Sequence, residues 1–419
     1  MKKLFSIVLC IMMVLTCTAV FAESSGEVEV VWLHNLDSGN QEFVDFLVNG
    51  FNETHPGIKI IPQYGGNWNE LNESLVMANA SGNGQIPGVA MCNTKFIAAY
   101  GNSGLFEDLN PYIEKTNYDV STIPAGVFGI GNVEDRQIAM PFLNNTQVIY
   151  YNKSVAEEYG LEIPKDFDKW DEFFHEVKEK TGMKPLAMQS LDFYYGTIYR
   201  NAGVTIVKDG KCDLNSESAI KITTQFQNWV KEGYVDWLSG SDASANMRQG
   251  FYDKQTFMVF HNSSALFNYM EKCDFEVGMG WYPGFNGVYN GDMGGGVIGI
   301  PSKNSQEVKD AAWQFIEYLE NPELSSVYVI EAACLPSRTT SIGSPEITAY
   351  LEEYPAYKTL FDNLENITPP FIHEGATEIC KVWQNYMNMI MLDGADVVET
   401  SNKMAHEIKG IMDDYELNP

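Results

Sequence analysis

EVEVVWLH, residues 27–34, is the stretch that decides the fold class, together with the two segments that follow it. It is rich in β-branched residues and stops at the turn-forming residues 35–40, which predicts a strand and a turn. Apolar side chains then recur at helical spacing through residues 43–51, and GIKII at residues 57–61 predicts a second strand, closed by Pro62. Strand, helix and strand in this order indicate a parallel α/β sheet with helices on both faces.

The same alternation continues along the rest of the chain. Further strands are predicted at residues 89–92, 148–151, 257–260 and 277–281. Further helices are predicted at residues 70–80, 220–230, 311–319, 322–333, 376–391 and 395–412. Neither a Pro-rich or Ser-rich linker nor a fixed-period repeat divides the sequence. We therefore expect two α/β lobes that share several chain crossings.

The charge balance of the chain is strongly acidic. The 419 residues include 56 Asp and Glu against 27 Lys and Arg, which gives a formal net charge of −29. Nucleic acids and anionic membrane surfaces bind through clustered Lys and Arg, so neither is expected as a partner. Hydrophobic residues make up 45% of the chain, which is typical of a globular protein with a sizeable core.

The N-terminus has the pattern of an export signal. Two lysines precede an apolar run at residues 4–15, and Val20-Phe21-Ala22 fits a cleavage point, so residues 1–22 are predicted to be a cleaved signal peptide. The protein is then expected in the periplasm. The alternative is lipidation of Cys17, which would anchor it at the outer face of the cytoplasmic membrane. The cysteines beyond the signal are widely spaced, so at most one or two disulfides are expected.

The search for catalytic and metal-binding motifs is negative. The sequence contains no GxSxG, Walker, HExxH or GxGxxG motif in the required context, and its six histidines lack metal-ligand spacing. We predict no catalytic residues, no metal and no cofactor. Gly294-Gly295-Gly296 precedes an apolar run instead of opening a helix, which favours a flexible crossing between lobes over a phosphate loop. The abundant carboxylates leave a secreted carbohydrate-active enzyme as a distant alternative.

Aromatic, amide and hydroxyl side chains follow the predicted strands where they end. Tyr64 and Trp68 come after the second strand, Asn93-Thr94 after the third, and His261-Asn262-Ser263 after the strand at 257–260. Ligands of open α/β sheets bind beyond the carboxyl ends of strands. Amides and hydroxyls both donate and accept, and aromatic rings stack on sugar rings, so this set suits a neutral polyhydroxylated ligand. Core packing and plain turn chemistry are the alternatives for these residues.

PFLNNTQVIYYNK, residues 141–153, resembles the substrate-binding proteins of ABC importers, the extracellular family 1 that includes maltose- and glycerol-3-phosphate-binding proteins. The segment after it is similar too, with Tyr159-Gly160-Leu161, Pro164 and a Trp-Asp-Glu helix start at Trp170. Further similarity lies at residues 51–56, 104–109, 251–258 and 335–338. The resemblance spans essentially the whole chain after the signal peptide.

The resemblance implies two α/β lobes with a ligand cleft between them and a hinge of several crossings. The N-terminal lobe would comprise residues 23–141 and 300–335. The C-terminal lobe with its closing helices would comprise residues 142–293 and 345–419, and the hinge crossings would lie near residues 142–147, 294–299 and 335–345. Closure on a ligand would be a hinge motion, and the closed protein would dock as a monomer on the permease.

The resemblance also implies site residues. Serines of the glycerol-3-phosphate binder fall near Asn144-Asn145, and its glycine pair resembles Gly295-Gly296. Its acidic contact is replaced here by Thr94, and its phosphate-facing arginine falls near Cys380 or Lys381, a weaker match to phosphate. The maltose-type Glu-Pro-Tyr resembles Asp192-Phe193-Tyr194. The predicted ligand-binding residues are Tyr64, Trp68, Asn93, Thr94, Asn144, Asn145, Asp192, Tyr194, His261, Asn262, Ser263, Gly295, Gly296 and Lys381.

These features together predict capture of a sugar or oligosaccharide outside the cytoplasm and its delivery to a membrane permease. The nearer alternative is a glycerol-3-phosphate or glycerophosphodiester-binding protein of an ABC importer. The identity of the sugar, its chain length and the pairing of the cysteines are left open by the sequence.

Overall fold

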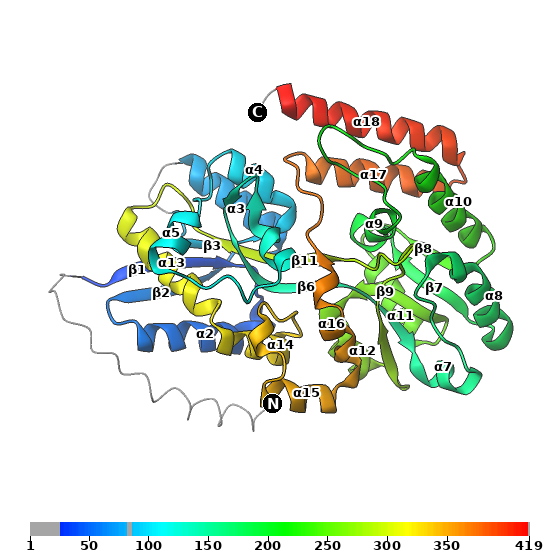
Figure 1. Cartoon of the computed structure of the whole chain (residues 1–419), viewed down its shortest axis with the longest axis horizontal. Coiled ribbons are helices and arrows are strands. Elements are labelled where there is room, and N and C mark those ends of the chain that lie inside the picture. The colour runs from blue at the N-terminus through cyan, green and yellow to red at the C-terminus, as the bar shows by residue number, and fades with distance from the viewer. Residues whose placement is uncertain (1–25, 82–85, 418–419) are drawn as a thin grey trace.

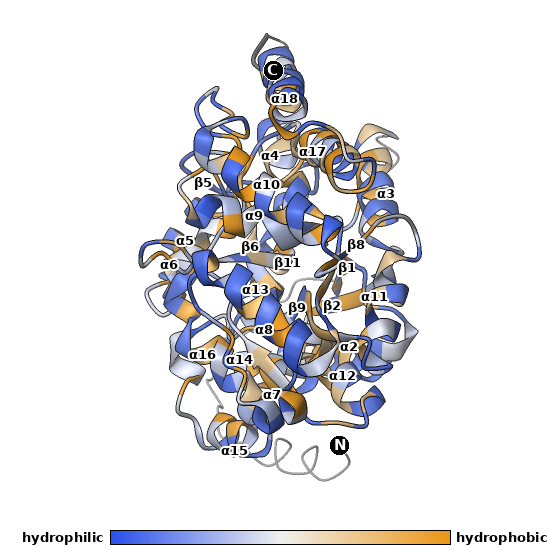
Figure 2. Ribbon diagram, turned by 90° about the vertical axis from the view of Figure 1, so that its right-hand side faces the viewer, coloured by the Kyte–Doolittle hydropathy of each residue, from blue (hydrophilic) through white to orange (hydrophobic). Residues whose placement is uncertain are grey.

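Two α/β lobes lie side by side and are joined by strands that run from one lobe into the other (Figure 1). The computed structural model describes residues 26–81 and 86–417. The predicted signal peptide and Cys17 lie outside the described residues. Hydrophilic residues colour much of the outer surface of the helices, and hydrophobic residues gather toward the strands at the centre of the view (Figure 2). The two-lobed α/β architecture predicted from the sequence is confirmed.

The N-terminal lobe is built on three parallel strands in the order β2-β1-β3. The helix that follows β1 buries four apolar residues at spacings of three and four, which is why it packs against the sheet. Its Phe51 contacts Phe315, with ring centroids 5.1 Å apart, so the two helices that carry these rings pack against each other. The elements are β1 (Val28–His34), α2 (Gln41–Thr54), β2 (Ile58–Tyr64), α3 (Trp68–Ser81), β3 (Val89–Asn93), α4 (Ile97–Asn102), α13 (Gln306–Leu319) and α14 (Pro322–Ala332).

The C-terminal lobe repeats this plan with the parallel order β9-β7-β8. Its core is aromatic, and Phe174 and Trp229 from two neighbouring helices lie with ring centroids 4.7 Å apart. The elements are α7 (Lys153–Tyr159), α8 (Trp170–Thr181), β7 (Lys184–Gln189), α9 (Asp192–Asn201), α10 (Glu217–Lys231), β8 (Val235–Leu238), α11 (Ala243–Tyr252), β9 (Thr256–Asn262), α12 (Leu266–Lys272), β10 (Val277–Gly280), α17 (Ala376–Met391) and α18 (Val397–Leu417).

Two long strands cross between the lobes. β6 (Met140–Asn152) and β11 (Gly291–Gly299) pair with each other, and β11 also pairs with β3 while β6 pairs with β9. All of these pairings are antiparallel, so the prediction of a parallel sheet holds only for the outer strands. The reason is that β11 enters the N-terminal sheet from the other lobe and lies between β3 and β6, an insertion that local strand-helix alternation does not reveal.

The glycine run at residues 294–296 lies inside β11, where Gly296 pairs with both β3 and β6 while Gly294 and Gly295 pair with β6 alone. The run is thus part of a strand that crosses between the lobes, and its flexibility stays a prediction. The ladder with β6 shifts between Gly295 and Gly296. Phe142 pairs with Gly296 and Asn144 with Gly295, which leaves Leu143 unpaired, and its φ is 51°. This is a β-bulge, and it lies where the two lobes meet.

The chain after α14 returns across the molecule. α15 (Pro345–Glu353) packs against α14, and Tyr354 at its C-terminal end contacts Phe267 of α12 with ring centroids 5.0 Å apart. α16 (Lys358–Asp362) follows, and its Thr359 donates to the carbonyl of Met279 at 3.0 Å. A short strand, β12 (Ile367–Thr368), then pairs with β11 before the chain enters α17. The lobe boundaries proposed from the sequence stay a prediction.

The cysteines of the described residues are all free thiols, which is within the expected limit of at most one or two disulfides. They are Cys92, Cys212, Cys273, Cys334 and Cys380. Residues 26–81 and 86–417 include no helix that is both long and apolar enough to cross a membrane.

Candidate functional site

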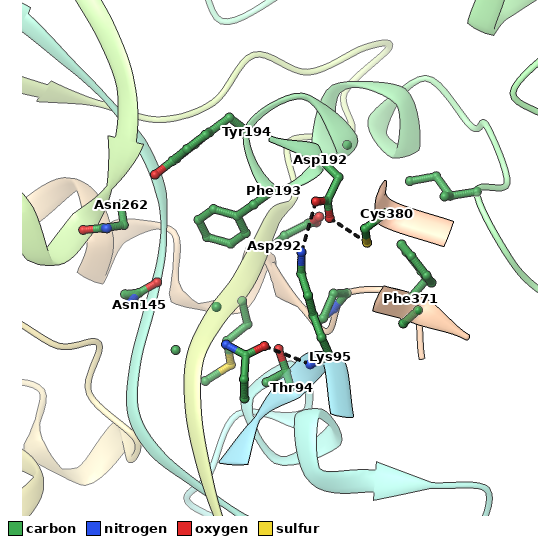
Figure 3. Close-up of a pocket in the computed structure, with 18 of the residues that line it drawn as sticks. Thr94, Lys95, Asn145, Asp192, Phe193, Tyr194, Asn262, Asp292, Phe371 and Cys380 are labelled. Atoms are coloured by element: carbon green, nitrogen blue, oxygen red, sulfur yellow. Dashed lines mark hydrogen bonds and ion pairs between the residues drawn. The ribbon is translucent and has the colours of Figure 1, made fainter. Parts of the chain in front are cut away.

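A cavity of about 230 Å³ lies between the lobes, at the carboxyl ends of β3 and β9. Both lobes and both crossing strands contribute to it, which is the position expected for a ligand site in two facing α/β sheets. Its walls include Asn93, Thr94, Lys95, Asn145, Asp192, Phe193, Tyr194, Asn262, Asp292, Met293, Gly294, Gly295, Phe371, Cys380 and Trp383 (Figure 3).

The N-terminal wall is polar. β3 ends at Asn93, whose side-chain oxygen accepts the N–H of Lys95 at 3.0 Å and so caps the short 3₁₀ turn η2 (Thr94–Phe96). This cap fixes the backbone direction at the strand end, and Thr94 and Lys95 follow it into the cavity wall. The wall therefore presents an amide, a hydroxyl and an ammonium group.

The C-terminal wall is aromatic. α9 begins at Asp192, and its first turn places Phe193 and Tyr194 against the cavity, with ring centroids 5.3 Å apart (Figure 3). Phe371 and the fully buried Trp383 close the far side. These rings offer flat apolar faces of the kind that stack on the C–H face of a sugar.

The glycine run forms the floor of the cavity, and two aromatic rings approach it closely. A Cβ at Gly294 would lie 2.8 Å from the ring of Phe193, and one at Gly296 would lie 2.9 Å from the ring of Trp68. Gly295, between them, has a φ of +95°, which side chains disfavour. The three glycines thus let one aromatic ring from each lobe approach the crossing strand.

The charges in the cavity wall are paired. Lys95 Nζ lies 3.1 Å from Asp192 Oδ1, and the thiol of Cys380 donates to Asp192 Oδ2 at 3.1 Å. Burial acts to lower the pKa of Lys95, but Asp192 outweighs it and the pKa is raised, so the ammonium is retained. Asp292 forms an ion pair with Arg200, whose pKa burial lowers to about 10.

The predicted site residues fall into three groups. Seven of them line the cavity, and these are Asn93, Thr94, Asn145, Asp192, Tyr194, Asn262 and Gly295. Five others lie directly behind its walls or floor, and these are Trp68, Asn144, His261, Ser263 and Gly296. Two lie away from it, because Tyr64 at the end of β2 is 55% exposed and Lys381 is exposed on α17.

The residues behind the walls hold the lining in place. Asn144 donates to the carbonyl of Gly296 at 2.7 Å, and the hydroxyl of Ser263 accepts the N–H of Thr146 at 3.2 Å. His261 packs on Tyr194 with ring centroids 6.1 Å apart, and burial lowers its pKa to about 4, so it is neutral at pH 7. These contacts couple the crossing strands to the aromatic wall.

Sequence reasoning missed several lining residues. Lys95 and Phe193 each neighbour a predicted residue, so extending the strand-end and helix-start segments by one position would have found them. Phe371 lies in the returning chain, where no local pattern marks a site. Cys380 lies on α17; the resemblance pointed to Cys380 or Lys381, and only Lys381 was kept as a predicted residue. Residues 380 and 381 differ in placement because successive helical side chains point about 100° apart.

A second cavity, of about 790 Å³, lies on the C-terminal lobe. α7, the end of β10 and the returning chain form its walls, with Tyr151, Trp281 and Tyr289 among the lining residues. Figure 1 places α7 and α16 on the opposite side of the crossing strands from α9 and α17. None of the predicted site residues lines this cavity.

Similarity to known proteins extends over most of the chain. Residues 47–359 match the family described as bacterial extracellular solute-binding protein. The sn-glycerol-3-phosphate-binding periplasmic protein UgpB of Yersinia pseudotuberculosis is 21% identical over 375 residues, which cover 84% of this chain and 83% of that protein.

Two solved structures share the fold. UgpB from Mycobacterium tuberculosis, in complex with glycerophosphocholine, has a TM-score of 0.81 at 18% identity and covers 94% of this chain and 100% of that one. The sugar-binding protein MalE from Xanthomonas citri has a TM-score of 0.81 at 19% identity, with 93% and 98% covered. The family match, the two-lobed fold and the cavity between the lobes agree: the chain belongs to the bacterial extracellular solute-binding proteins, the solute-binding components of ABC transporters.

Proposed function

We propose that this protein captures an uncharged sugar or oligosaccharide outside the cytoplasm and delivers it to an ABC permease. The observation that carries the proposal is the charge balance of the cavity. Lys95 is the only Lys or Arg among the described lining residues, and its ammonium is held by Asp192. An anionic ligand would therefore meet no unpaired cation there, whereas a neutral ligand needs none.

The remaining lining chemistry supports a polyhydroxylated ligand. Asn93, Asn145 and Asn262 supply amides that both donate and accept, as sugar hydroxyls require. Phe193 and Tyr194 supply ring faces for the apolar side of a pyranose. A small number of oriented polar groups among aromatic walls is the usual composition of a selective small-molecule site.

The proposed cycle needs no catalysis. Ligand would bridge the polar and the aromatic wall and so favour the closed arrangement of the lobes by its differential affinity for that state. The closed monomer would dock on the permease, after export directed by residues 1–22. We assign the protein no enzymatic role, cofactor or metal.

The second candidate ligand is glycerol-3-phosphate or a glycerophosphodiester. It is favoured by the similarity to two UgpB proteins, one of them solved with glycerophosphocholine. Two features weigh against it: Lys381, the cation that the sequence suggested for a phosphate, is exposed outside the cavity, and a carboxylate neutralises Lys95.

The proposal is tested by titrating the purified mature protein with a panel of mono- and oligosaccharides and with sn-glycerol-3-phosphate. Trp383 lines the cavity, so we expect a change in tryptophan fluorescence and a rise in Tm with at least one carbohydrate. Mass spectrometry after prolonged incubation should recover the carbohydrate unchanged; turnover would favour the enzyme alternative. Binding of glycerol-3-phosphate without binding of any carbohydrate would reject the proposed ligand class.

A further inference from the structure

We propose that Asp192 sets the charge selectivity of the cavity: by pairing with Lys95 across the cleft it excludes phosphate esters and leaves a site for neutral ligands. This inference rests on the proposed function, since it names the residue that makes the same site prefer uncharged ligands. It follows from the geometry of three side chains, Lys95, Asp192 and Cys380.

The ion pair joins the two lobes. Lys95 belongs to η2, directly after β3 of the N-terminal lobe, and Asp192 is the first residue of α9 in the C-terminal lobe. Their charged atoms are 3.1 Å apart although the residues are 97 positions apart in the sequence. The pair therefore spans the ligand cavity itself (Figure 3).

Cys380 fixes the orientation of the carboxylate. Its thiol donates to Oδ2 at 3.1 Å while Lys95 donates to Oδ1 at 3.1 Å, so both carboxylate oxygens are engaged. Burial, and then Asp192, raise the pKa of Cys380, which keeps the thiol protonated and able to donate. The side chain of Asp192 is only 13% exposed, so solvent screens its charge weakly.

This arrangement treats neutral and anionic ligands differently. An ammonium has three N–H groups, so Lys95 can give one to Asp192 and others to ligand hydroxyls. A phosphate would have to approach the same ammonium beside a fixed, poorly screened carboxylate, which repels it. Asp292, the second lining carboxylate, is paired with Arg200, so Arg200 is not free to bind an anionic ligand either.

The test is the variant Asp192→Asn, which keeps the size of the side chain and removes its charge. Isothermal titration with sn-glycerol-3-phosphate should show affinity at least roughly tenfold higher than for the wild type, because the ammonium gains a charged partner. Adding Lys95→Met to this variant should remove the gain. Binding of the carbohydrate identified with the wild type is measured in parallel.

Glu107→Gln is the matched control. Glu107 forms a comparable, partly buried ion pair with Lys309 at 2.6 Å, and neither residue lines the cavity. The control variant frees a lysine by the same chemical change, so it should show no gain in phosphate affinity. If Asp192→Asn melts below the assay temperature, Asp192→Ser repeats the test with a smaller neutral side chain.

Three outcomes would overturn the inference: a folded neutral variant without a gain, an equal gain in Glu107→Gln, or a gain that survives Lys95→Met. Failure of the proposed function looks different. In that case the wild type binds no carbohydrate, while the neutral variant at position 192 still gains phosphate affinity that depends on Lys95.

Discussion

The two walls of the ligand cavity are built from different elements and different chemistry. The N-terminal wall is the end of a strand, where the cap by Asn93 positions a hydroxyl and an ammonium group. The C-terminal wall is the first turn of α9, which places Phe193 and Tyr194 against the cavity. One lobe thus offers directional hydrogen bonds and the other offers apolar faces. Under the proposed function, a ligand would gain both kinds of contact only when the lobes are close together, so the division itself would couple binding to closure.

Acid should lower the folding stability of the protein through His261, which lies behind the aromatic wall. His261 packs on Tyr194, and its pKa is lowered from 6.5 to about 4 by burial. The unfolded chain binds this proton near pH 6.5 and the folded protein does not, so stability falls as the pH drops from about 6.5 to about 4. This one group should account for a loss of roughly 3 kcal/mol at pH 4. Urea unfolding at pH 7 and pH 4 should show a smaller loss in His261→Gln than in the wild type.

The control for this measurement is His406→Gln, since His406 is exposed on α18. That variant should keep the full pH dependence of the wild type. An identical pH dependence in His261→Gln and the wild type would show that the histidine behind the aromatic wall is not the group that resists protonation.

Removing a ring from the aromatic wall should have the largest effect on affinity. Phe193→Ala is expected to weaken carbohydrate binding by roughly thirtyfold, or about 2 kcal/mol, because an aromatic ring that would stack on the ligand is lost. Isothermal titration measures the change, and thermal melting shows whether the variant folds. Tyr289→Ala removes an aromatic side chain from the second cavity instead, and its affinity should equal that of the wild type. Equal losses in both variants would point to a general loss of structure.

Removing a hydroxyl from the polar wall should have a smaller effect. Thr94→Val keeps the shape of the side chain and deletes one hydrogen-bonding group, so affinity should fall about fivefold, the worth of a single hydrogen bond. Thr94→Ser retains the hydroxyl and should bind nearly as well as the wild type. If the serine variant loses as much as the valine variant, the methyl group and not the hydroxyl is what the ligand contacts.

Tyr64 should matter least of the predicted aromatic residues. It lies 55% exposed at the end of β2 and does not line the cavity. Tyr64→Ala is therefore expected to change affinity by less than about twofold, as surface substitutions usually do. A tenfold loss in the same titration would mean that an aromatic residue of the N-terminal lobe contacts the ligand. The two walls would then not differ in chemistry as described above.

The sequence predicted the outer strands well because their signal is local. Runs such as residues 28–34 and 58–61 are rich in β-branched residues, and the structure has strands there. The predicted stop at Pro62 was wrong: β2 continues to Tyr64, because it is an edge strand, where a proline is tolerated. The antiparallel insertion of β11 was missed, because it brings together segments about 150 residues apart that share no local pattern.

The cavity-lining residues were likewise predictable where their signal was local. Amides at strand ends, such as Asn93 and Asn262, line the cavity because the ends of strands open toward it. Cys380 and Phe371 reach it only through the returning chain, and their placement depends on how the last helices pack. Lys381 illustrates the limit: a single step along a helix moves a side chain from the cavity to solvent.

The unpaired Leu143 has a consequence for how the chain could be altered. Side chains alternate between the two faces of a strand, so one extra residue sets the facing of everything that follows it in β6. Deleting Leu143 would leave the pairs Phe142–Gly296 and Asn144–Gly295 adjacent in an unbroken ladder, with Asn145 still facing as its partner Gly294 does. Pairing Leu143 itself with Gly295 would instead turn the residues after it toward the opposite face. The bulge thus works as a phase shift within β6: it offsets the alternation of the residues before it from that of the residues after it, and so fixes the face of the strand on which Asn145 lies.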